Sequence, residues 1–111
     1  MRSTEMYAVI YRYETNEQAV ASIMQSVSTD FADRVPAQIG SLLYTAIDTG
    51  DGTATTIVLY PDEDAARRGM KVSAEVRDAL DATHGVTETE RIHGEVLVHR
   101  ATDEVTKRID P

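Results

Sequence analysis

The 111-residue sequence contains no cysteine and no tryptophan, and it has a single asparagine and only two lysines. Without cysteine, a disulfide scaffold, thiol catalysis and a cysteine-ligated zinc site are excluded. No apolar run approaches the roughly 20 residues that span a bilayer. The N-terminus also lacks the apolar block and cleavage site of a signal peptide. We therefore expect a cytoplasmic protein that does not bind membranes.

The negative net charge of the chain argues against partners that are themselves negatively charged. The formal net charge is −8, so the phosphates of a nucleic acid or of an anionic membrane would be repelled. A hydrophobic fraction of 41% and a charged fraction of 27% are typical of a globular chain. The length suits one domain, which we place at residues 1–101, followed by a polar C-terminal tail at 102–111.

Alternating apolar residues predict strands, and apolar residues three and four apart predict helices. Thr15 is the expected N-cap of the first helix, Asp62 that of the second, and Asp51-Gly52 is a favoured hairpin pair. The predicted strands are Met6–Tyr13, Ser41–Asp48, Thr53–Tyr60 and Thr89–Arg100, and the predicted helices are 15–34 and 62–84.

The predicted element order is β-α-β-β-α-β. Right-handed crossovers place such a chain in a ferredoxin-like α+β fold, a four-stranded antiparallel sheet with both helices on one face. The other face would then be open, apolar and too large for a monomer to expose. We therefore expect a homodimer in which a second copy packs on the open sheet face.

The last predicted strand, with the sequence TERIHGEVLVHR, has two unlike faces. Alternation groups the apolar Ile92, Val96 and Val98, which we expect to face the helices. The opposite group would then face away from them; it consists of Arg91, His93, Glu95, Leu97 and His99.

His93 and Glu95 are the predicted catalytic pair, because a histidine beside a carboxylate can serve as a general base with an orienting partner. The same two residues could be metal ligands, or they could rim a dimer interface and hydrogen-bond across it. No metal and no cofactor are assigned to them.

Four further residues are predicted to bind substrate. Tyr11 and Tyr44 would line a pocket for a small aromatic ligand, and the alternative for both is packing in the core or interface. Arg12 would hold an anionic group, and its alternative is a salt bridge to a carboxylate such as Glu95. His99 would lie further along the His93 face.

Four local features accompany the β-α-β-β-α-β order: the loop 36–40, the TGDGT turn at 49–53, the YPDEDAA helix entry at 60–66 and the GEV sequence at 94–96. Together they resemble the dimeric α/β-barrel superfamily, and in particular its small antibiotic-biosynthesis-monooxygenase-like proteins, so the expected homodimer would form a dimeric α/β barrel. The resemblance covers about residues 6–100. It implies a cavity in each protomer and an activity such as cofactor-independent oxygenation of a small aromatic or quinol-type compound.

The resemblance also implies alternative functions, and the sequence lacks catalytic residues that two groups of relatives use. Cofactor-free oxygenases of this group use Asn, Trp and Arg, whereas this chain has no Trp and its one Asn is Asn16. Haem-degrading relatives pair a histidine with an asparagine; His84 lies near the right helix, but no asparagine accompanies it. A non-catalytic ligand-binding or structural homodimer and a haem-binding protein therefore remain as alternatives.

Overall fold

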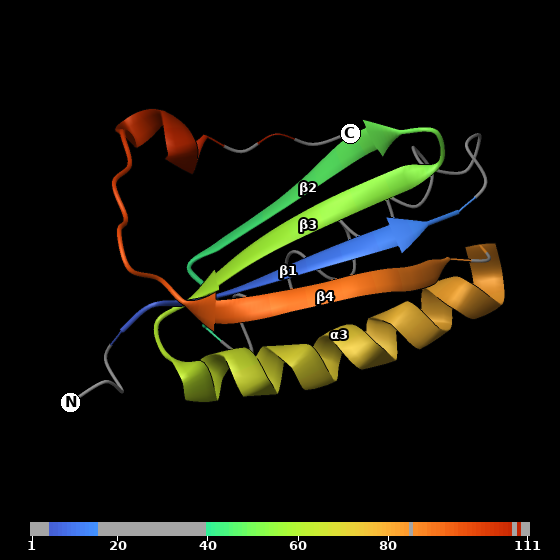
Figure 1. Cartoon of the computed structure of the whole chain (residues 1–111), viewed down its shortest axis with the longest axis horizontal. Helices are drawn as coiled ribbons and strands as arrows, with labels where there is room; N and C mark the ends of the chain where they lie inside the picture. The colour runs from blue at the N-terminus through green and yellow to red at the C-terminus, as the bar shows by residue number, and fades with distance from the viewer. Residues whose placement is uncertain (1–4, 16–39, 85, 108, 110–111) are drawn as a thin grey trace.

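The computed structural model describes residues 5–15, 40–84, 86–107 and 109 (Figure 1). The helix predicted over 15–34 lies outside these residues except for Thr15. The described elements are β1 (Tyr7–Glu14), β2 (Leu43–Gly50), β3 (Thr53–Tyr60), α3 (Glu63–His84), β4 (Thr87–Glu95) and the short 3₁₀-helix η4 (Asp103–Thr106).

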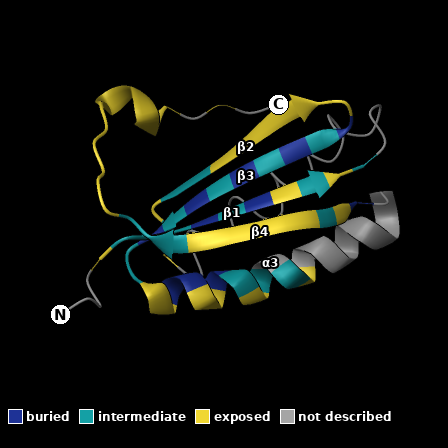
Figure 2. Cartoon of the chain, viewed as in Figure 1, coloured by how far each residue is buried: buried dark blue, intermediate teal, exposed yellow. Residues whose placement is uncertain are grey.

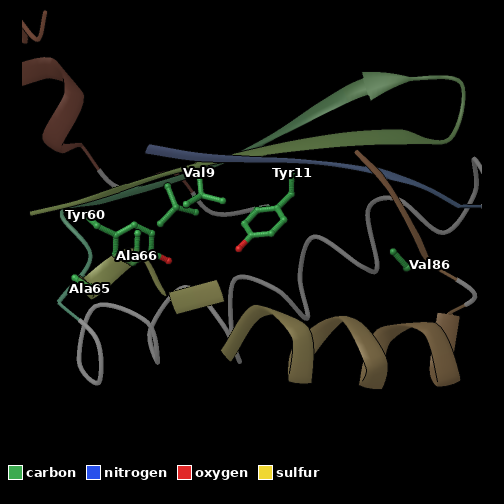
Figure 3. Packing of buried hydrophobic residues seen from close by; sticks show 7 residues of the cluster. Val9, Tyr11, Tyr60, Ala65, Ala66 and Val86 are labelled. Carbon is green, nitrogen blue, oxygen red and sulfur yellow. The ribbon is translucent and has the colours of Figure 1, made fainter. Parts of the chain in front are cut away.

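The four strands form one antiparallel sheet in the order β2-β3-β1-β4. The central pair, β1 and β3, comes from opposite halves of the chain, and β2 and β4 are the edges. Helix α3 covers one face of this sheet (Figures 1 and 3). This is the ferredoxin-like arrangement, so the predicted fold class is confirmed.

The β2–β3 hairpin has the turn chemistry that its sequence predicts. Gly50 pairs with Thr53, and the two residues between them have positive φ angles, 55° at Asp51 and 75° at Gly52. Positive φ at both central residues defines a type I′ turn, whose twist matches that of the flanking strands. The hydroxyl of Thr53 donates to the carbonyl oxygen of Gly50 across 2.6 Å.

Helix α3 begins where the sequence predicts. The carboxylate of Asp62 accepts a hydrogen bond from the backbone N–H of Ala65 at 2.8 Å, which makes Asp62 the N-cap. Glu63 and Asp64 then place negative charge at the positive end of the helix dipole. Among the described residues, no helix is long and apolar enough to cross a membrane.

The core lies between the sheet and α3 (Figure 3). The residues buried there come from the two central strands, the first turn of α3 and the position just before β4, and they are Val9, Tyr11, Val58, Tyr60, Ala65, Ala66 and Val86. Figure 2 shows the two edge strands largely exposed beside the darker β3. The small residues at the start of α3 let the helix approach the sheet closely.

The last strand differs from its prediction at both ends. β4 runs from Thr87 to Glu95, not from Thr89 to Arg100. Pairing ends because β1 begins at Tyr7, and the final bond of the ladder runs from the N–H of Val96 to the carbonyl oxygen of Met6. Beyond it the chain is irregular until η4, a helical turn that was not predicted in the tail.

Candidate functional site

All five tyrosines of the chain lie on the helix-facing side of the sheet. The strand register fixes this, because residues directly opposite each other in an antiparallel pair share a face. One row across the sheet reads Tyr44–Val58–Val9–His93, and its neighbours read Tyr60–Tyr7–Glu95 and Ala46–Thr56–Tyr11–Arg91. Tyr13 follows on β1, opposite Ala54. The helix-facing side thus combines aromatic rings with one histidine and an arginine.

The same register reverses the orientation that we predicted for the last strand. His93, Glu95 and Arg91 lie on the helix-facing side, whereas Ile92, half exposed at 50%, lies on the open side opposite Ile10. Val98 was predicted to join the core, but it lies beyond the strand and is 73% exposed. The prediction failed because both faces of this sheet are apolar, so apolar side chains did not identify the covered face.

His93 is held by Tyr7. The phenolic oxygen of Tyr7 lies 2.8 Å from Nδ1 of His93, and the two ring centroids are 5.8 Å apart. Sequence reasoning named Glu95 as the orienting partner, and Glu95 lies on the same face opposite Tyr7. Among the described residues, the partner of Nδ1 is Tyr7 rather than Glu95. The alternation of residues along β1 could not predict this contact, because it does not show which residues of a distant strand lie opposite Tyr7.

Arg91 lies over the buried ring of Tyr11. Its guanidinium carbon is 5.4 Å from the ring centroid, and Nη2 is 3.1 Å from a carboxylate oxygen of Glu88. The pairing shifts by one residue between Arg12 and Tyr13, so Thr89 lies opposite no residue of β1 in the register, although its hydroxyl donates to the carbonyl oxygen of Arg12 at 3.3 Å. This irregularity turns Glu88 to the same face as Arg91, as β-bulges commonly do. Tyr13 stacks on Tyr11 with centroids 6.0 Å apart.

Burial keeps three of the tyrosines protonated. Desolvation raises the pKa of Tyr13, Tyr44 and Tyr60 well above the ordinary value of 10.0, because a phenolate would lose its hydration there. Neighbouring phenols raise the pKa further in each case. The largest such contribution comes from Tyr11 for both Tyr13 and Tyr60, and from Tyr13 for Tyr44. A phenol of ordinary pKa is already protonated at neutral pH, so the effect of this burial is that these three groups keep their protons in alkaline solution as well.

Tyr60 lies at the end of β3 and is completely buried. Its hydroxyl has no hydrogen-bond partner among the described residues, and it lies against Gly69 of α3, where a Cβ would have no room. In Figure 3 its hydroxyl and that of Tyr11 both point into the layer between the sheet and α3. No pattern in the sequence identified Tyr60 as the residue that packs against Gly69.

Two predicted substrate-binding residues do not join this cluster. Arg12 lies on the open face, where its guanidinium is 3.4 Å from Glu90, so the predicted salt bridge exists with a different carboxylate than Glu95. Glu95 lies on the opposite side of the sheet and cannot serve. His99 lies in the exposed segment after β4 rather than along the His93 face. Tyr11, Tyr44, His93 and Glu95 do share one face.

A metal centre has no support in the described part of the chain. No group of three or more His, Asp or Glu side chains lies together there. The predicted pair His93 and Glu95 therefore has no third ligand among these residues.

No protein-family model and no curated protein matches the sequence. Solved structures do match. SnoaB, a cofactor-independent oxygenase from Streptomyces nogalater, is 18% identical with a TM-score of 0.60, over 89% of this chain and 98% of that one. The monooxygenase ActVA-Orf6 of Streptomyces coelicolor, in complex with nanaomycin D, is 16% identical with a TM-score of 0.64, over 90% and 94%.

A third match comes from another genus. MupZ from Pseudomonas fluorescens is 12% identical with a TM-score of 0.67, over 80% of this chain and 70% of that one. Putative antibiotic biosynthesis monooxygenases are also among the matches. The resemblance seen in the sequence is thereby confirmed at the level of structure: the chain has the ferredoxin-like fold of the antibiotic-biosynthesis-monooxygenase-like proteins.

Proposed function

We propose that this protein is a cofactor-independent oxygenase of a small aromatic compound that carries an acidic ring hydroxyl or methylene. The observation that carries the proposal is the Tyr7–His93 hydrogen bond on an aromatic face. The fold adds support, because SnoaB is a cofactor-independent oxygenase and ActVA-Orf6 is a monooxygenase. Aromatic rings on one face suit a flat ligand, and a histidine can remove a proton near neutral pH.

His93 is the proposed base. If Nδ1 carries the proton and donates to the oxygen of Tyr7, then Nε2 has a free lone pair. Among the described residues, no protein atom bonds Nε2. His93 is exposed on the edge strand β4, so a ligand has access to this nitrogen from the sheet edge. The oxygen of Tyr7 would then stabilise the imidazolium that forms after proton transfer.

The proposed reaction uses only the substrate and molecular oxygen. His93 takes a proton from a ring methylene, and the resulting carbanion transfers one electron to O₂, which gives an organic radical and superoxide. The two radicals combine to form a C–O bond, and the peroxide takes the proton back from His93. Loss of water, with the second hydrogen of the carbon, leaves a ring carbonyl. One oxygen atom of O₂ enters the product and the other leaves as water.

The remaining polar groups of this face have roles in binding. The cation of Arg91 would stabilise the negative charge that develops on the substrate, since it already lies over Tyr11 on the same side as His93. Tyr44, which is only partly buried, would contact an aromatic ring of the substrate. Tyr11 is fully buried in the core, as the alternative predicted from the sequence had it, and would support Arg91 from beneath. Glu95 lies opposite Tyr7, and its role as a second catalytic residue beside His93 remains a prediction.

Oxygen uptake with anthrone as the test substrate would examine this proposal. We expect His93→Gln to lower the rate about 10²- to 10⁴-fold, the usual contribution of a general base. Tyr7→Phe should lower it less, because the base remains. His99→Gln is the matched control, since His99 is exposed and lies outside the sheet. Full activity in the His93→Gln variant would contradict the proposal.

The same assay separates the proposed enzyme from its non-catalytic alternative. Binding of anthraquinone to the protein, without oxygen uptake from anthrone or from a panel of quinols, would favour a ligand-binding protein. Oxygen uptake that depends on His93 would favour the oxygenase.

A further inference from the structure

Two glutamates of β4, Glu88 and Glu90, are only two positions apart but lie on opposite faces of the sheet. Such residues share a face on a regular strand, and the register shift at Thr89 separates them here. Glu90 lies opposite Arg12 on the open face, whereas Glu88 lies opposite Tyr13 on the helix-facing side. The side chain of Glu88 is 16% exposed and that of Glu90 is 47% exposed. The irregularity therefore brings one carboxylate, mostly buried, to the aromatic face.

Both carboxylate oxygens of Glu88 contact a single nitrogen of Arg91. Nη2 of Arg91 lies 3.2 Å from Oε1 and 3.1 Å from Oε2. The guanidinium also lies over the buried ring of Tyr11, so two contacts fix its position. Among the described residues, no atom accepts a hydrogen bond from Nε or Nη1 of Arg91. A ligand could bind these two nitrogens, but it would do so with the charge of Glu88 close to the same guanidinium.

Negative charge exceeds positive charge on this side of the sheet. The strand register places three carboxylates and one guanidinium there, which belong to Asp48, Glu88, Glu95 and Arg91. The pKa of Tyr13 reflects this balance. Burial raises it most, Tyr11 and then Glu88 raise it further, and the lowering by Arg91 is the smallest of these effects. A negatively charged group is therefore disfavoured at this end of the aromatic face.

We propose that Glu88 is a specificity-determining residue, through which the site accepts uncharged aromatic ligands and discriminates against those that carry a carboxylate. This inference rests on the proposed function, which places the ligand beside His93 and Arg91. A carboxylate on Nε and Nη1 would be attracted by Arg91 and repelled by Glu88. Water and salt screen such a repulsion little at short range between partly buried groups. An uncharged ligand is not subject to it.

The proposed reaction is compatible with this selectivity. The substrate is neutral when it binds, and it becomes an anion only when His93 takes its proton. The imidazolium that forms in the same step offsets the new negative charge. Glu88 therefore acts against a ligand that is already charged, whereas proton transfer within the site leaves the net charge of the site unchanged.

A purely structural Glu88 would behave differently. If its only role were to hold Arg91 in place, its removal would weaken the binding of charged and uncharged ligands alike. The proposed role predicts the opposite for a charged ligand, because removal of the repelling carboxylate leaves the attraction of Arg91 unopposed. Stronger binding of a carboxylate alone therefore distinguishes the two roles.

Isothermal titration calorimetry with two quinones of similar shape tests the proposal. The probes are anthraquinone-2-carboxylate and the uncharged 2-(hydroxymethyl)anthraquinone. We expect the natural chain to bind the carboxylate about tenfold more weakly than the alcohol, and Glu88→Gln to remove most of this difference without changing the affinity for the alcohol. Glu90→Gln is the matched control, because it removes the same charge from the same strand but on the open face.

A double variant shows whether the gain depends on Arg91. In the Glu88→Gln background, Arg91→Gln should abolish the stronger binding of the carboxylate, because the cation that attracts it is gone. The comparison of the two quinones with the natural chain needs no variant. It therefore decides the matter even if the Glu88→Gln variant does not fold.

Three results would overturn the proposal. The first is a natural chain that binds the carboxylate as tightly as the alcohol. The second is a Glu88→Gln variant without a gain for the carboxylate, and the third is an equal gain from Glu90→Gln. Binding of neither quinone would overturn this proposal and the proposed function together. The predicted selectivity without oxygen uptake from anthrone would support the role of Glu88 and contradict only the oxygenase.

Discussion

The phenolic ring of Tyr60 lies against Gly69, with its hydroxyl in the space that a Cβ on the glycine would need. The residues come from the end of β3 and the second turn of α3. Glycine within a helix costs about 1 kcal/mol relative to alanine. The chain accepts that cost because only glycine lets a tyrosine ring lie between helix and sheet at this point.

Gly69→Ala should therefore destabilise the protein even though alanine favours helix. The added Cβ would meet the hydroxyl and the ring of Tyr60, both in a fully buried position. Overpacking of this kind costs about 1–3 kcal/mol, which exceeds the gain in helix propensity. Urea denaturation would measure the difference. A variant that is more stable than the natural chain would contradict the packing described.

Tyr60→Phe should leave the free energy of unfolding unchanged or raise it by about 1 kcal/mol. Its buried hydroxyl has no hydrogen-bond partner among the described residues, so removing it relieves a desolvation cost. Tyr7→Phe is the matched comparison, because it removes a hydroxyl that does bond, to His93. We expect that variant to lose about 0.5–1.5 kcal/mol. A large loss from Tyr60→Phe would mean that its hydroxyl has a partner.

The two arginines of neighbouring strands should contribute unequally to stability. Arg12 makes one exposed ion pair at 3.4 Å, and such pairs contribute little, about 0–1 kcal/mol. Arg91 combines an ion pair to Glu88 with a position over the buried ring of Tyr11. We expect Arg91→Ala to cost about 1 kcal/mol more than Arg12→Ala in urea denaturation. Equal effects would show that the contact with Tyr11 adds nothing.

Much of the fold follows from local patterns. The hairpin, the N-cap of α3 and the strand β3 lie where the sequence places them, because turn glycines, capping residues and β-branched runs act on their nearest neighbours. The order of the elements then fixes the topology through the handedness of crossovers. These features need no knowledge of distant contacts.

The orientation of β4 could not be found in this way. Both faces of β1 are apolar, and only the register between β1 and β4 shows that His93 lies beside Val9 and Tyr7. That register joins residues more than eighty positions apart. The register of this pair also shifts by one residue at Thr89, and an alternating sequence pattern does not predict such a shift. Hence the composition of the site was predicted in part, whereas its face and its Tyr7 contact were not.

Gly52→Ala should destabilise the hairpin. Gly52 has a φ of 75°, and an alanine there would be forced into the left-handed region at a cost of about 1–2 kcal/mol. Asp51→Asn is the matched control, because asparagine tolerates the φ of 55° at that position. Urea denaturation of both variants would measure the difference. If Gly52→Ala proved neutral, the turn would have to be of another type.

Stability should fall as the pH rises above about 10, and the buried tyrosines should be the cause. Burial raises the pKa of Tyr13, Tyr44 and Tyr60 in the folded chain, whereas the unfolded value is 10.0. Below pH 10 both states keep these protons, so the stabilising contribution is fully present. Above it the unfolded chain releases protons that the folded chain retains, which favours unfolding.

Each such tyrosine should add a slope of up to about 1.4 kcal/mol per pH unit to the decline. Urea denaturation at a series of alkaline pH values would measure the total slope, and Tyr44→Phe should reduce it by the share of one group. The chain has only two lysines, so few other side chains change charge in the same range. An ultraviolet titration in which all five tyrosines ionise together near pH 10 would contradict the burial of these three.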